Sequence, residues 1–500
     1  MICVPEILEK LKKTDSEKIL AVPLIEKLPV LDLNPVALYQ LLKSQGEVSF
    51  FYESNEDSGL TGRYTFMGLD PVSTITINGE VLTVAPSGES FSVQRPFDKL
   101  QQILDQYQLF EHCELPPFAS GVVGFVGHEC IYSMQDITRV SKPGYDFLDD
   151  ATLMIFKSII VLDRLEGKLQ LISNLFLKPG QGQLEENYLE GIENLNKLSR
   201  LVERARSHKL APLPTGAKCP PQKVESLLKR SQFRSRFSKI KGHIRRGNLF
   251  QCVLSNRFQT AVESDPLTIY RVLRHTSPVP YLYYLQLGET ALFGASPERF
   301  VQVEDGMVET RPIAGTRPRG ANRPEDLRLE AELLSDEKEK AEHLMLVDLG
   351  RNDIGKVSRA GTVKVTQYMQ VERFSNVMHL VSKVRGELKK GIAPLQAFCS
   401  CFVAGTLSGA PKRKAIEILL ELEPVERGPY GGAILYYDFR GNFDSCITIR
   451  SLLVHDKMAY FQAGAGIVAD SVEESEYLEI IAKTGAITRT LNQVENGVAK

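Results

Sequence analysis

Two pairs of glutamates, each spaced three residues apart, are the side chains of this sequence best suited to hold a metal ion. Glu339 and Glu342 form one pair, and Glu476 and Glu479 form the other. Residues three apart share one face of a helix, so two such helices could line a pocket with carboxylates. Carboxylate oxygens suit hard cations, and Mg2+ is the usual choice where substrate oxygens complete the coordination. Such a pair on a charged helix is more often a solvated face, so the pattern alone leaves both interpretations open.

Other candidate residues are polar groups in unusual surroundings. Glu298 follows Pro297, where a lone glutamate is usually part of a surface turn, and His379 lies in an apolar run, where a core histidine is the default. Arg450 lies within a predicted strand, and a substrate carboxylate would satisfy its charge through two parallel hydrogen bonds. Gly315 and Thr316 follow two apolar residues and offer a backbone amide and a hydroxyl to an anion or ether oxygen.

The glycine-rich segment Gly464-Ala465-Gly466 imitates a dinucleotide-binding fingerprint, but no helix follows it directly. A backbone that a ligand can approach closely explains these glycines better. The sequence contains no phosphate-binding loop, no serine nucleophile elbow and no cysteine in the setting of a glutamine-hydrolysing enzyme. The residues together predict a Mg2+-dependent enzyme that acts on a small anionic substrate, with glutamate and histidine as proton carriers.

The elements that must position these residues are strands and helices in separate blocks. Turn signals such as Asn78-Gly79 separate short β-like runs in the first half, which favours an antiparallel sheet. Strands are predicted at 48–52, 73–77, 81–85, 119–125, 153–162, 169–175, 251–258, 281–287, 290–294, 300–303, 433–438, 445–454 and 458–463. Helices are predicted at 185–207, 224–246, 325–334, 336–349 (with Ser335 as its N-cap), 394–401 and 412–421. Strands grouped on either side of a helical block indicate an α+β fold.

Length and composition limit the class of protein. A chain of 500 residues is too long for one ordinary core, and the proline-rich stretch 208–222 is the best linker, so we expect domains at 1–207 and 223–500. The net charge of −2 gives no electrostatic reason to expect nucleic acid or a membrane as partner. Eight scattered cysteines without Cys-x-x-Cys spacing favour free thiols in a reducing compartment. Because no signal peptide or membrane-spanning run is evident, we expect a cytoplasmic protein.

Taken together, the motifs resemble those of the chorismate-utilising enzymes, and within them the large (synthase) subunit family of anthranilate synthase. The resemblance covers about Gln222 to the end, and it is carried by Gly247–Ser255, Ala295–Glu298, Arg311–Gly320, Glu342–Asp353, Glu372–Val384, Ala404–Pro411, Tyr430–Gly432 and Gln462–Asp470. It implies large antiparallel β-sheets packed as a sandwich with helices on the outside. It also implies conversion of chorismate and ammonia to anthranilate and pyruvate, with Mg2+ as cofactor.

The resemblance also implies a role for each matching residue. Glu342 and Glu479 are the expected metal ligands, supported by Glu339 and Glu476. Glu298 is the expected general acid for departure of the C4 hydroxyl, and His379 is expected to serve the later elimination of pyruvate. The expected substrate contacts are Gly315, Thr316 (also placed among the catalytic residues), Tyr430, Arg450, Gly464, Ala465, Gly466 and Lys483.

Two positions distinguish among relatives by their nucleophile. Water-using members carry a lysine base where this chain has Gln251, and aminodeoxychorismate synthases typically carry a lysine nucleophile where it has Ala314. An amide cannot deprotonate water and alanine has no nucleophile, so direct attack by ammonia is favoured. Aminodeoxychorismate synthase component I, or a non-catalytic binding subunit, remain the alternatives.

The resemblance further implies a partner and a regulator. Because the chain shows no glutamine-hydrolysing site, a separate glutamine amidotransferase small subunit is expected to supply the ammonia. Feedback inhibition by tryptophan is expected, with the effector contacts at Ser54, Pro280, Tyr281 and Leu282.

Overall fold

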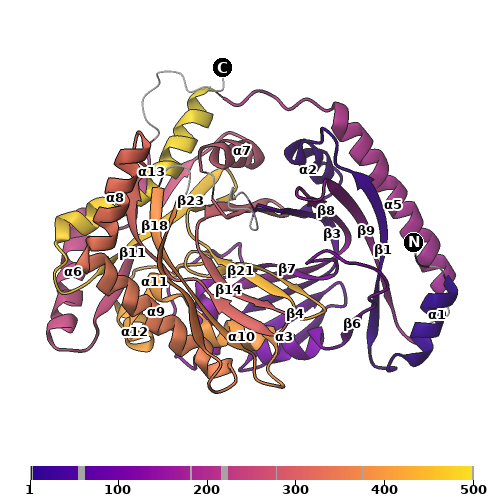
Figure 1. Cartoon of the computed structure of the whole chain (residues 1–500), viewed down its shortest axis with the longest axis horizontal. Helices are drawn as coiled ribbons and strands as arrows, with labels where there is room; N and C mark the ends of the chain where they lie inside the picture. The colour runs from indigo at the N-terminus through magenta and orange to yellow at the C-terminus, as the bar shows by residue number, and fades with distance from the viewer. Residues whose placement is uncertain are drawn as a thin grey trace.

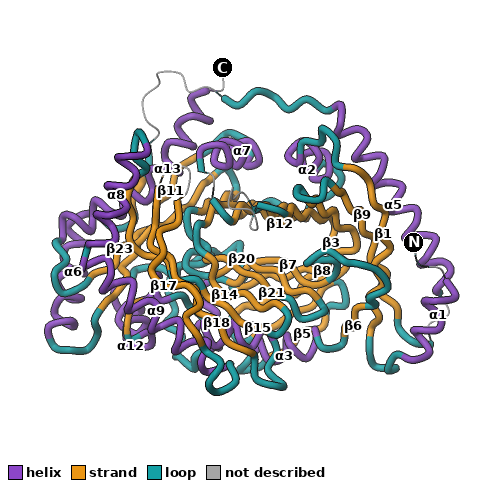
Figure 2. The backbone as a smooth tube through the Cα atoms, in the orientation of Figure 1, coloured by secondary structure: helices purple, strands orange, loops and turns teal. Residues whose placement is uncertain are grey.

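Two antiparallel sheets form the framework of the molecule, and helices lie along their outer sides (Figures 1 and 2). The computed structural model describes residues 2, 4–54, 62–180, 183–214, 223–277, 279–373 and 377–497. Long strands with nearly continuous apolar sequence, such as β8 (Ala151–Asp163), are buried along almost their whole length. Burial on both faces therefore explains their uninterrupted hydrophobic runs.

The first sheet contains strands from both ends of the chain. Its strand order is β6 (Tyr107–Leu109), β1 (Ile19–Pro29), β9 (Lys168–Leu177), β8, β3 (Tyr64–Asn78), β2 (Val48–Glu53), β12 (Tyr281–Leu287), β13 (Thr290–Ser296), β22 (Ser451–His455), β23 (Met458–Ile467) and β11 (Gln251–Ala261). Two short strands, β10 (Glu225–Ser226) and β19 (Gly409–Ala410), pair with β11.

The second sheet shares β3 and β8 with the first and continues in a different direction. From β8 its order is β7 (Gly121–Val126), β20 (Ala433–Asp438), β21 (Phe443–Ile447), β14 (Arg299–Glu304), β15 (Met307–Thr310) and β18 (Val377–Glu387), which pairs with both β16 (Ile313–Pro318) and β17 (Lys364–Arg373). Strands β4 (Val81–Ala85) and β5 (Glu89–Ser92) extend from β3.

The inter-sheet core is rich in aromatic side chains contributed by both sheets, including Phe50, Phe156 and Tyr283 from the first and Phe125 from the second, where the aliphatic Ile434 joins them. Helices cover the outer faces through two further cores. Those on the first sheet are α1 (Val4–Lys13), α2 (Pro35–Lys43), α5 (Leu184–Ser207), α6 (Arg230–Arg245), α7 (Pro266–Thr276) and α13 (Glu473–Gly497). Those on the second are α3 (Pro96–Leu104), α4 (Ile131–Met134), α9 (Glu337–Val357), α10 (Pro394–Cys401) and α11 (Gly405–Ser408), while α12 (Lys412–Leu422) joins both cores.

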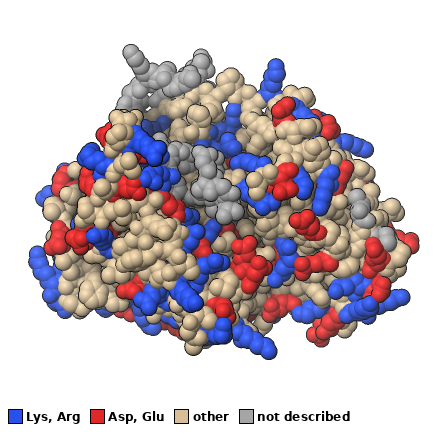
Figure 3. Space-filling view, in the orientation of Figure 1, with Lys and Arg blue, Asp and Glu red and all other residues tan. Residues whose placement is uncertain are grey.

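This architecture confirms the predicted fold class, a sandwich of large antiparallel sheets with external helices. A separate small cluster packs α8 (Arg323–Ser335) against β18 through Leu333, Met378 and Leu380. No helix in the described ranges is long and apolar enough to cross a membrane. Lysine and arginine are interspersed with aspartate and glutamate over the face seen in Figure 3, so neither sign of charge dominates it.

Three local predictions were wrong. The helix predicted at 224–246 starts only at Arg230, because the residues before it pair with β11 as β10. The strand predicted at 445–454 divides into β21 and β22, and Arg450 lies between them at φ +53° rather than within a strand. Ser335 ends α8 and does not cap the next helix; Asp336 does so, accepting from the amides of Lys338 and Glu339.

The two halves of the chain are joined by strand pairing as well as by sequence. Strand β2 pairs with β12, and β7 pairs with β20. Of the predicted linker, residues 208–214 contain no helix or strand, and residues 215–222 lie outside the described ranges. The domain boundaries at 207 and 223 stay a prediction.

Candidate active site

A cavity of about 280 Å3, here called the acidic pocket, gathers most of the predicted site residues. It lies among α9, α13, β18 and β23, which Figure 1 places on the same side of the molecule. Its lining includes Glu298, Thr316, Glu342, His379, Tyr430, Arg450, Gly464, Gly466, Glu476, Glu479 and Lys483. Segments more than 180 residues apart in sequence therefore meet in one cavity.

Three predicted residues lie beside the acidic pocket rather than in its lining. Ala465 is fully buried in β23 between the two glycines that line the cavity, as alternation along a strand requires. A side chain on Gly315 would meet Leu333 and, at 3.3 Å, the Glu339 carboxylate. Glu339 itself lies 3.5 Å from the guanidinium of Arg317. Gly315 and Glu339 thus form a second layer behind the cavity wall.

Glu298 has the properties of a general acid near neutral pH. Burial raises the pKa of its carboxyl group from 4.5 to about 7, although the Thr406 hydroxyl and the charge of Lys483 act in the opposite direction. Thr406 donates a hydrogen bond to Glu298 Oε1 at 3.0 Å. A carboxyl group with a pKa near 7 holds its proton long enough to donate it and can also recover it.

His379 has the properties of a neutral base. Its Nδ1 lies 3.0 Å from the carbonyl oxygen of Gly315, so Nδ1 carries the proton and donates it to that oxygen. The Thr316 hydroxyl lies 3.0 Å from the same nitrogen. Burial, together with the nearby charge of Arg450, lowers the pKa of His379. The neutral imidazole therefore has its basic nitrogen at Nε2.

The carboxylates on α9 and α13 repel one another in the acidic pocket. Burial raises the pKa of Glu342, and the carboxylates of Glu339 and Glu479 raise it further. Burial also raises the pKa of Glu476, whose Oε2 is buried and has no hydrogen-bond partner among the described residues. Such a group of acids, with an unsatisfied oxygen among them, fits a divalent cation that would relieve the repulsion.

A lysine partly compensates for this negative charge. Lys483 Nζ lies 2.7 Å from Glu479 Oε1 and donates to the carbonyl oxygen of Gly464 at 2.9 Å. In the described part of the chain, no three acidic, histidine or cysteine side chains already converge as a formed metal centre. The glutamates therefore fit a cation, but the Glu479 carboxylate is occupied by its ion pair with Lys483.

The opposite wall of the acidic pocket suits an anion. Burial lowers the pKa of Arg450, and no carboxylate partner of its guanidinium is found among the described residues. The glycines of β23 beside Arg450 leave the backbone of this wall exposed to the cavity, because they carry no side chain. A side chain on Gly464 would lie 3.0 Å from the Tyr430 hydroxyl, and one on Gly466 would lie 2.7 Å from Gln251 Nε2. Only glycine leaves room for those polar groups at the cavity.

Sequence reasoning missed two residues of this site. Thr406 holds the Glu298 carboxyl group, and Gln462 lines the cavity with its amide fixed by a 2.7 Å hydrogen bond to Ser255. Both lie inside segments that carry the family resemblance. The polar side chains within those segments could therefore have been added to the candidate site residues. Ser255 in turn donates to Glu423, which is paired with the fully buried Arg427.

A second cavity of about 460 Å3, here called the inter-sheet pocket, contains the predicted effector contacts. Ser54, Tyr281 and Leu282 line it, together with residues of the second sheet such as Arg299 and Asp444. Pro280 is buried next to Tyr281 and is not part of the lining. The cavity has both apolar walls and charged groups, which suits a zwitterion with a large apolar side chain.

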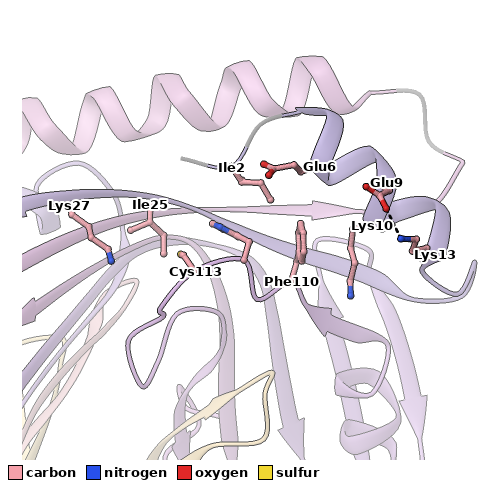
Figure 4. Close-up of a pocket in the computed structure, with 10 residues that line it drawn as sticks. Ile2, Glu6, Glu9, Lys10, Lys13, Ile25, Lys27, Phe110 and Cys113 are labelled. Atoms are coloured by element: carbon pink, nitrogen blue, oxygen red, sulfur yellow. Dashed lines mark hydrogen bonds and ion pairs between the residues drawn. The ribbon is translucent and has the colours of Figure 1, made fainter.

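A third cavity, about 780 Å3, is a groove between α1 and the first sheet (Figure 4). Its lining includes both acidic and basic side chains, and Lys13 Nζ lies 2.6 Å from Glu9 Oε1. Phe110 and Ile25 form its apolar surface, as the close-up shows. None of the catalytic candidates lies there, so we assign the chemistry to the smaller acidic pocket.

A family model described as chorismate binding enzyme matches residues 47–489. The chain therefore belongs to the chorismate-binding enzymes. Among curated relatives, it is 40% identical over 463 residues to anthranilate synthase component 1 of Acetivibrio thermocellus, with 92% of this chain and 93% of the relative covered. It is 37% identical to the protein of the same name from Aquifex aeolicus, with 98% of both chains covered.

Solved structures agree with this assignment. The crystal structure of anthranilate synthase component I from Streptococcus pneumoniae superposes with a TM-score of 0.75 at 35% identity, covering 93% of this chain and 99% of that chain. The menaquinone-specific isochorismate synthase of Escherichia coli has a TM-score of 0.70 at 19% identity, covering 98% of each chain. The second likeness shows the shared fold alone.

Proposed function

We propose that the protein is the synthase component of an anthranilate synthase, which converts chorismate and ammonia to anthranilate and pyruvate in the first step of tryptophan biosynthesis. The observation that carries this proposal is that Glu298, His379 and Arg450 line one cavity together with a group of glutamates. Glu298 has a raised pKa and His379 a lowered one, and among the described residues no carboxylate pairs with the Arg450 guanidinium. The relatives named anthranilate synthase component 1 support the choice of reaction.

In the first step, ammonia forms a bond to C2 of chorismate while the C4 hydroxyl departs. Glu298 gives its proton to that hydroxyl, which leaves as water, and the ring double bonds shift between the two carbons. The ammonium group formed at C2 then loses one proton, which balances the proton that Glu298 gave up. Gln251, with its Nε2 3.4 Å from Glu342, offers no basic group that could activate water instead. Ala314 lines the pocket without a nucleophile, so ammonia itself must attack.

In the second step, the intermediate loses the proton on C2 and the bond between C3 and the ether oxygen. His379 accepts the C2 proton at Nε2, and the enolpyruvyl group leaves as the enolate of pyruvate, which becomes pyruvate when its methylene carbon takes up a proton. Arg450 binds the carboxylate of the enolpyruvyl group, and the Gly464–Gly466 backbone keeps that group close to the base. Aromatisation of the ring favours this step.

We further propose that Glu342 and Glu479 hold Mg2+, with Glu339 and Glu476 supporting them. The bound ion would hold the ring carboxylate of chorismate and offset the charge of the four acids. Lys483 must then release Glu479, and its ammonium group becomes available to the substrate. A glutamine amidotransferase subunit as the source of ammonia, and tryptophan as ligand of the inter-sheet pocket, belong to the same proposal.

The test is anthranilate fluorescence from the purified chain with chorismate, Mg2+ and ammonium at alkaline pH. The chain contains no tryptophan, so its own emission does not obscure the product. Emission that depends on Mg2+ supports the proposal. Consumption of chorismate without that emission would instead indicate the 4-amino or hydroxylated product, and product analysis would decide between them.

A further inference from the structure

Two consecutive residues line the acidic pocket and the inter-sheet pocket, one in each cavity. Glu298 lines the acidic pocket, and the next residue, Arg299, lines the inter-sheet pocket. Consecutive residues of an extended chain point to opposite faces. Any displacement of this segment therefore moves one side chain in each cavity.

On the inter-sheet side, Arg299 is held by a residue of the proposed effector site. Its Nε donates to the Tyr281 hydroxyl at 2.7 Å, and its Nη1 donates to Glu309 Oε1 at 2.9 Å. The Tyr281 hydroxyl in turn donates to Asp444 at 3.1 Å. A ligand that occupies this cavity against Tyr281 must compete for these bonds, because the hydroxyl lies between two charged groups.

On the acidic side, Glu298 is held by hydrogen bonds at its amide, its carbonyl oxygen and its carboxyl group, and the amide donates to Ser296 Oγ at 3.4 Å. Its carbonyl oxygen accepts from the Ile447 amide at 3.0 Å, and its carboxyl group accepts from Thr406 at 3.0 Å. Strand β14 begins at Arg299, which is paired with Cys446 of β21. A shift of the first residue of this strand is therefore passed directly to the proton donor, whose alignment with the leaving hydroxyl sets the rate.

We propose that Arg299 is a positioning residue that couples occupancy of the inter-sheet pocket to the placement of Glu298. A ligand bound against Tyr281 displaces the Arg299 guanidinium, and the Glu298 carboxyl group moves out of line with the substrate. This inference rests on the proposed function, since it takes tryptophan as that ligand and proton donation by Glu298 as the step affected.

The experiment separates binding of tryptophan from its effect on catalysis. The Y281F variant removes the hydroxyl that contacts Arg299. The matched control is Y283F, which removes a hydroxyl from the same strand and the same cavity, where it contacts Ser451 and not Arg299. Tryptophan binding is measured by the fluorescence of the ligand, which the chain itself does not obscure. Inhibition is measured as the ratio of kcat/KM for chorismate without and with saturating tryptophan.

We expect a ratio of at least about tenfold for the unmodified chain and for Y283F, within the usual range of coupling between sites. In Y281F the ratio should fall to within about twofold of unity while tryptophan still binds. If Y281F binds tryptophan and remains inhibited, the coupling role of Arg299 is wrong. If Y281F does not bind tryptophan, the same measurements are made on R299K, which keeps the positive charge but removes the Nε donor. R299K should then bind tryptophan with a kcat/KM ratio close to unity, and continued inhibition would refute the coupling role. Failure of the unmodified chain to bind tryptophan would instead overturn the effector assignment, and this inference with it.

Discussion

Replacing Thr406 by valine tests whether Glu298 is the proton donor. The T406V substitution keeps the shape of the side chain but removes the 3.0 Å hydrogen bond to Glu298 Oε1. That bond stabilises the carboxylate, so its loss should raise the pKa of Glu298 above its value of about 7. A hydrogen bond to a charged group contributes about 1.5–3 kcal/mol, and one pKa unit corresponds to about 1.4 kcal/mol. With the lower figure, we expect a shift of about one unit.

The direction of the change follows from the role of the acid. Glu298 must be protonated to act, so kcat/KM for chorismate should fall as the pH rises through about 7. In T406V the fall should come about one pH unit higher. The assay is anthranilate fluorescence at each pH, with total ammonium adjusted so that the concentration of free ammonia stays constant. T406S, which restores the hydroxyl, should return the profile to its original position.

Two results would refute this reasoning. If the T406V profile coincides with that of the unmodified chain, the hydrogen bond does not control the ionisation that limits the reaction. If the E298Q variant, which has no acidic proton, still forms anthranilate at a comparable rate, Glu298 is not the general acid. The pH dependence of kcat/KM reports the free enzyme, so it is the appropriate comparison with the pKa of the unliganded chain.

Three further perturbations test other parts of the site. E342Q, which removes a proposed metal ligand, should lack Mg2+-dependent activity while its circular dichroism spectrum stays unchanged. The control E337Q, exposed on the same helix, should retain activity. Turnover by E342Q would refute the metal assignment. R450M should reduce kcat/KM for chorismate at least about tenfold, measured by steady-state kinetics, because charge-assisted bonds to the substrate carboxylate are lost; an unchanged value would place the anion elsewhere. E298Q should melt at a higher temperature than the unmodified chain at pH 8 and at nearly the same temperature at pH 4. The raised pKa of the buried acid destabilises the fold as the pH rises from 4.5 to about 7, by about 3 kcal/mol; equal melting temperatures at pH 8 would contradict the burial of this carboxyl group.

The elements that sequence patterns predicted best have strong boundaries on both sides. Helix α10 was predicted with its observed bounds, since Pro394 opens it, and β4 lies between clear turns. Strands β17 and β18 were missed, because β17 is largely exposed and its composition is polar. The local pattern alone therefore favoured a core residue at His379, and only the family resemblance placed it in the site; the strand brings it to the cavity.

Sequence patterns predicted the helices that carry the candidate glutamates but not how those helices meet in space. Spacing alone suggested that each glutamate pair shares a helix face, and α9 and α13 confirm that arrangement for both pairs. Their meeting across 134 residues depended on the family resemblance, because no local pattern encodes which helices approach one another. The contact between Thr406 and Glu298, which joins residues 108 apart in sequence, was missed for the same reason. The φ of +53° at Arg450 also comes from tertiary contacts, since β propensity favoured a continuous strand there.

The pairing of β7 with β20 has a consequence for biosynthesis of the chain. Strand β7 ends at Val126, and its partner begins at Ala433. At translation rates of about 5–20 residues per second, a ribosome needs roughly 15 to 60 seconds to make the intervening chain. During that interval the nascent protein presents an unpaired, fully apolar strand edge, which is an attractive template for other chains. Efficient production of the protein should therefore depend on chaperones that shield this edge until synthesis is nearly complete.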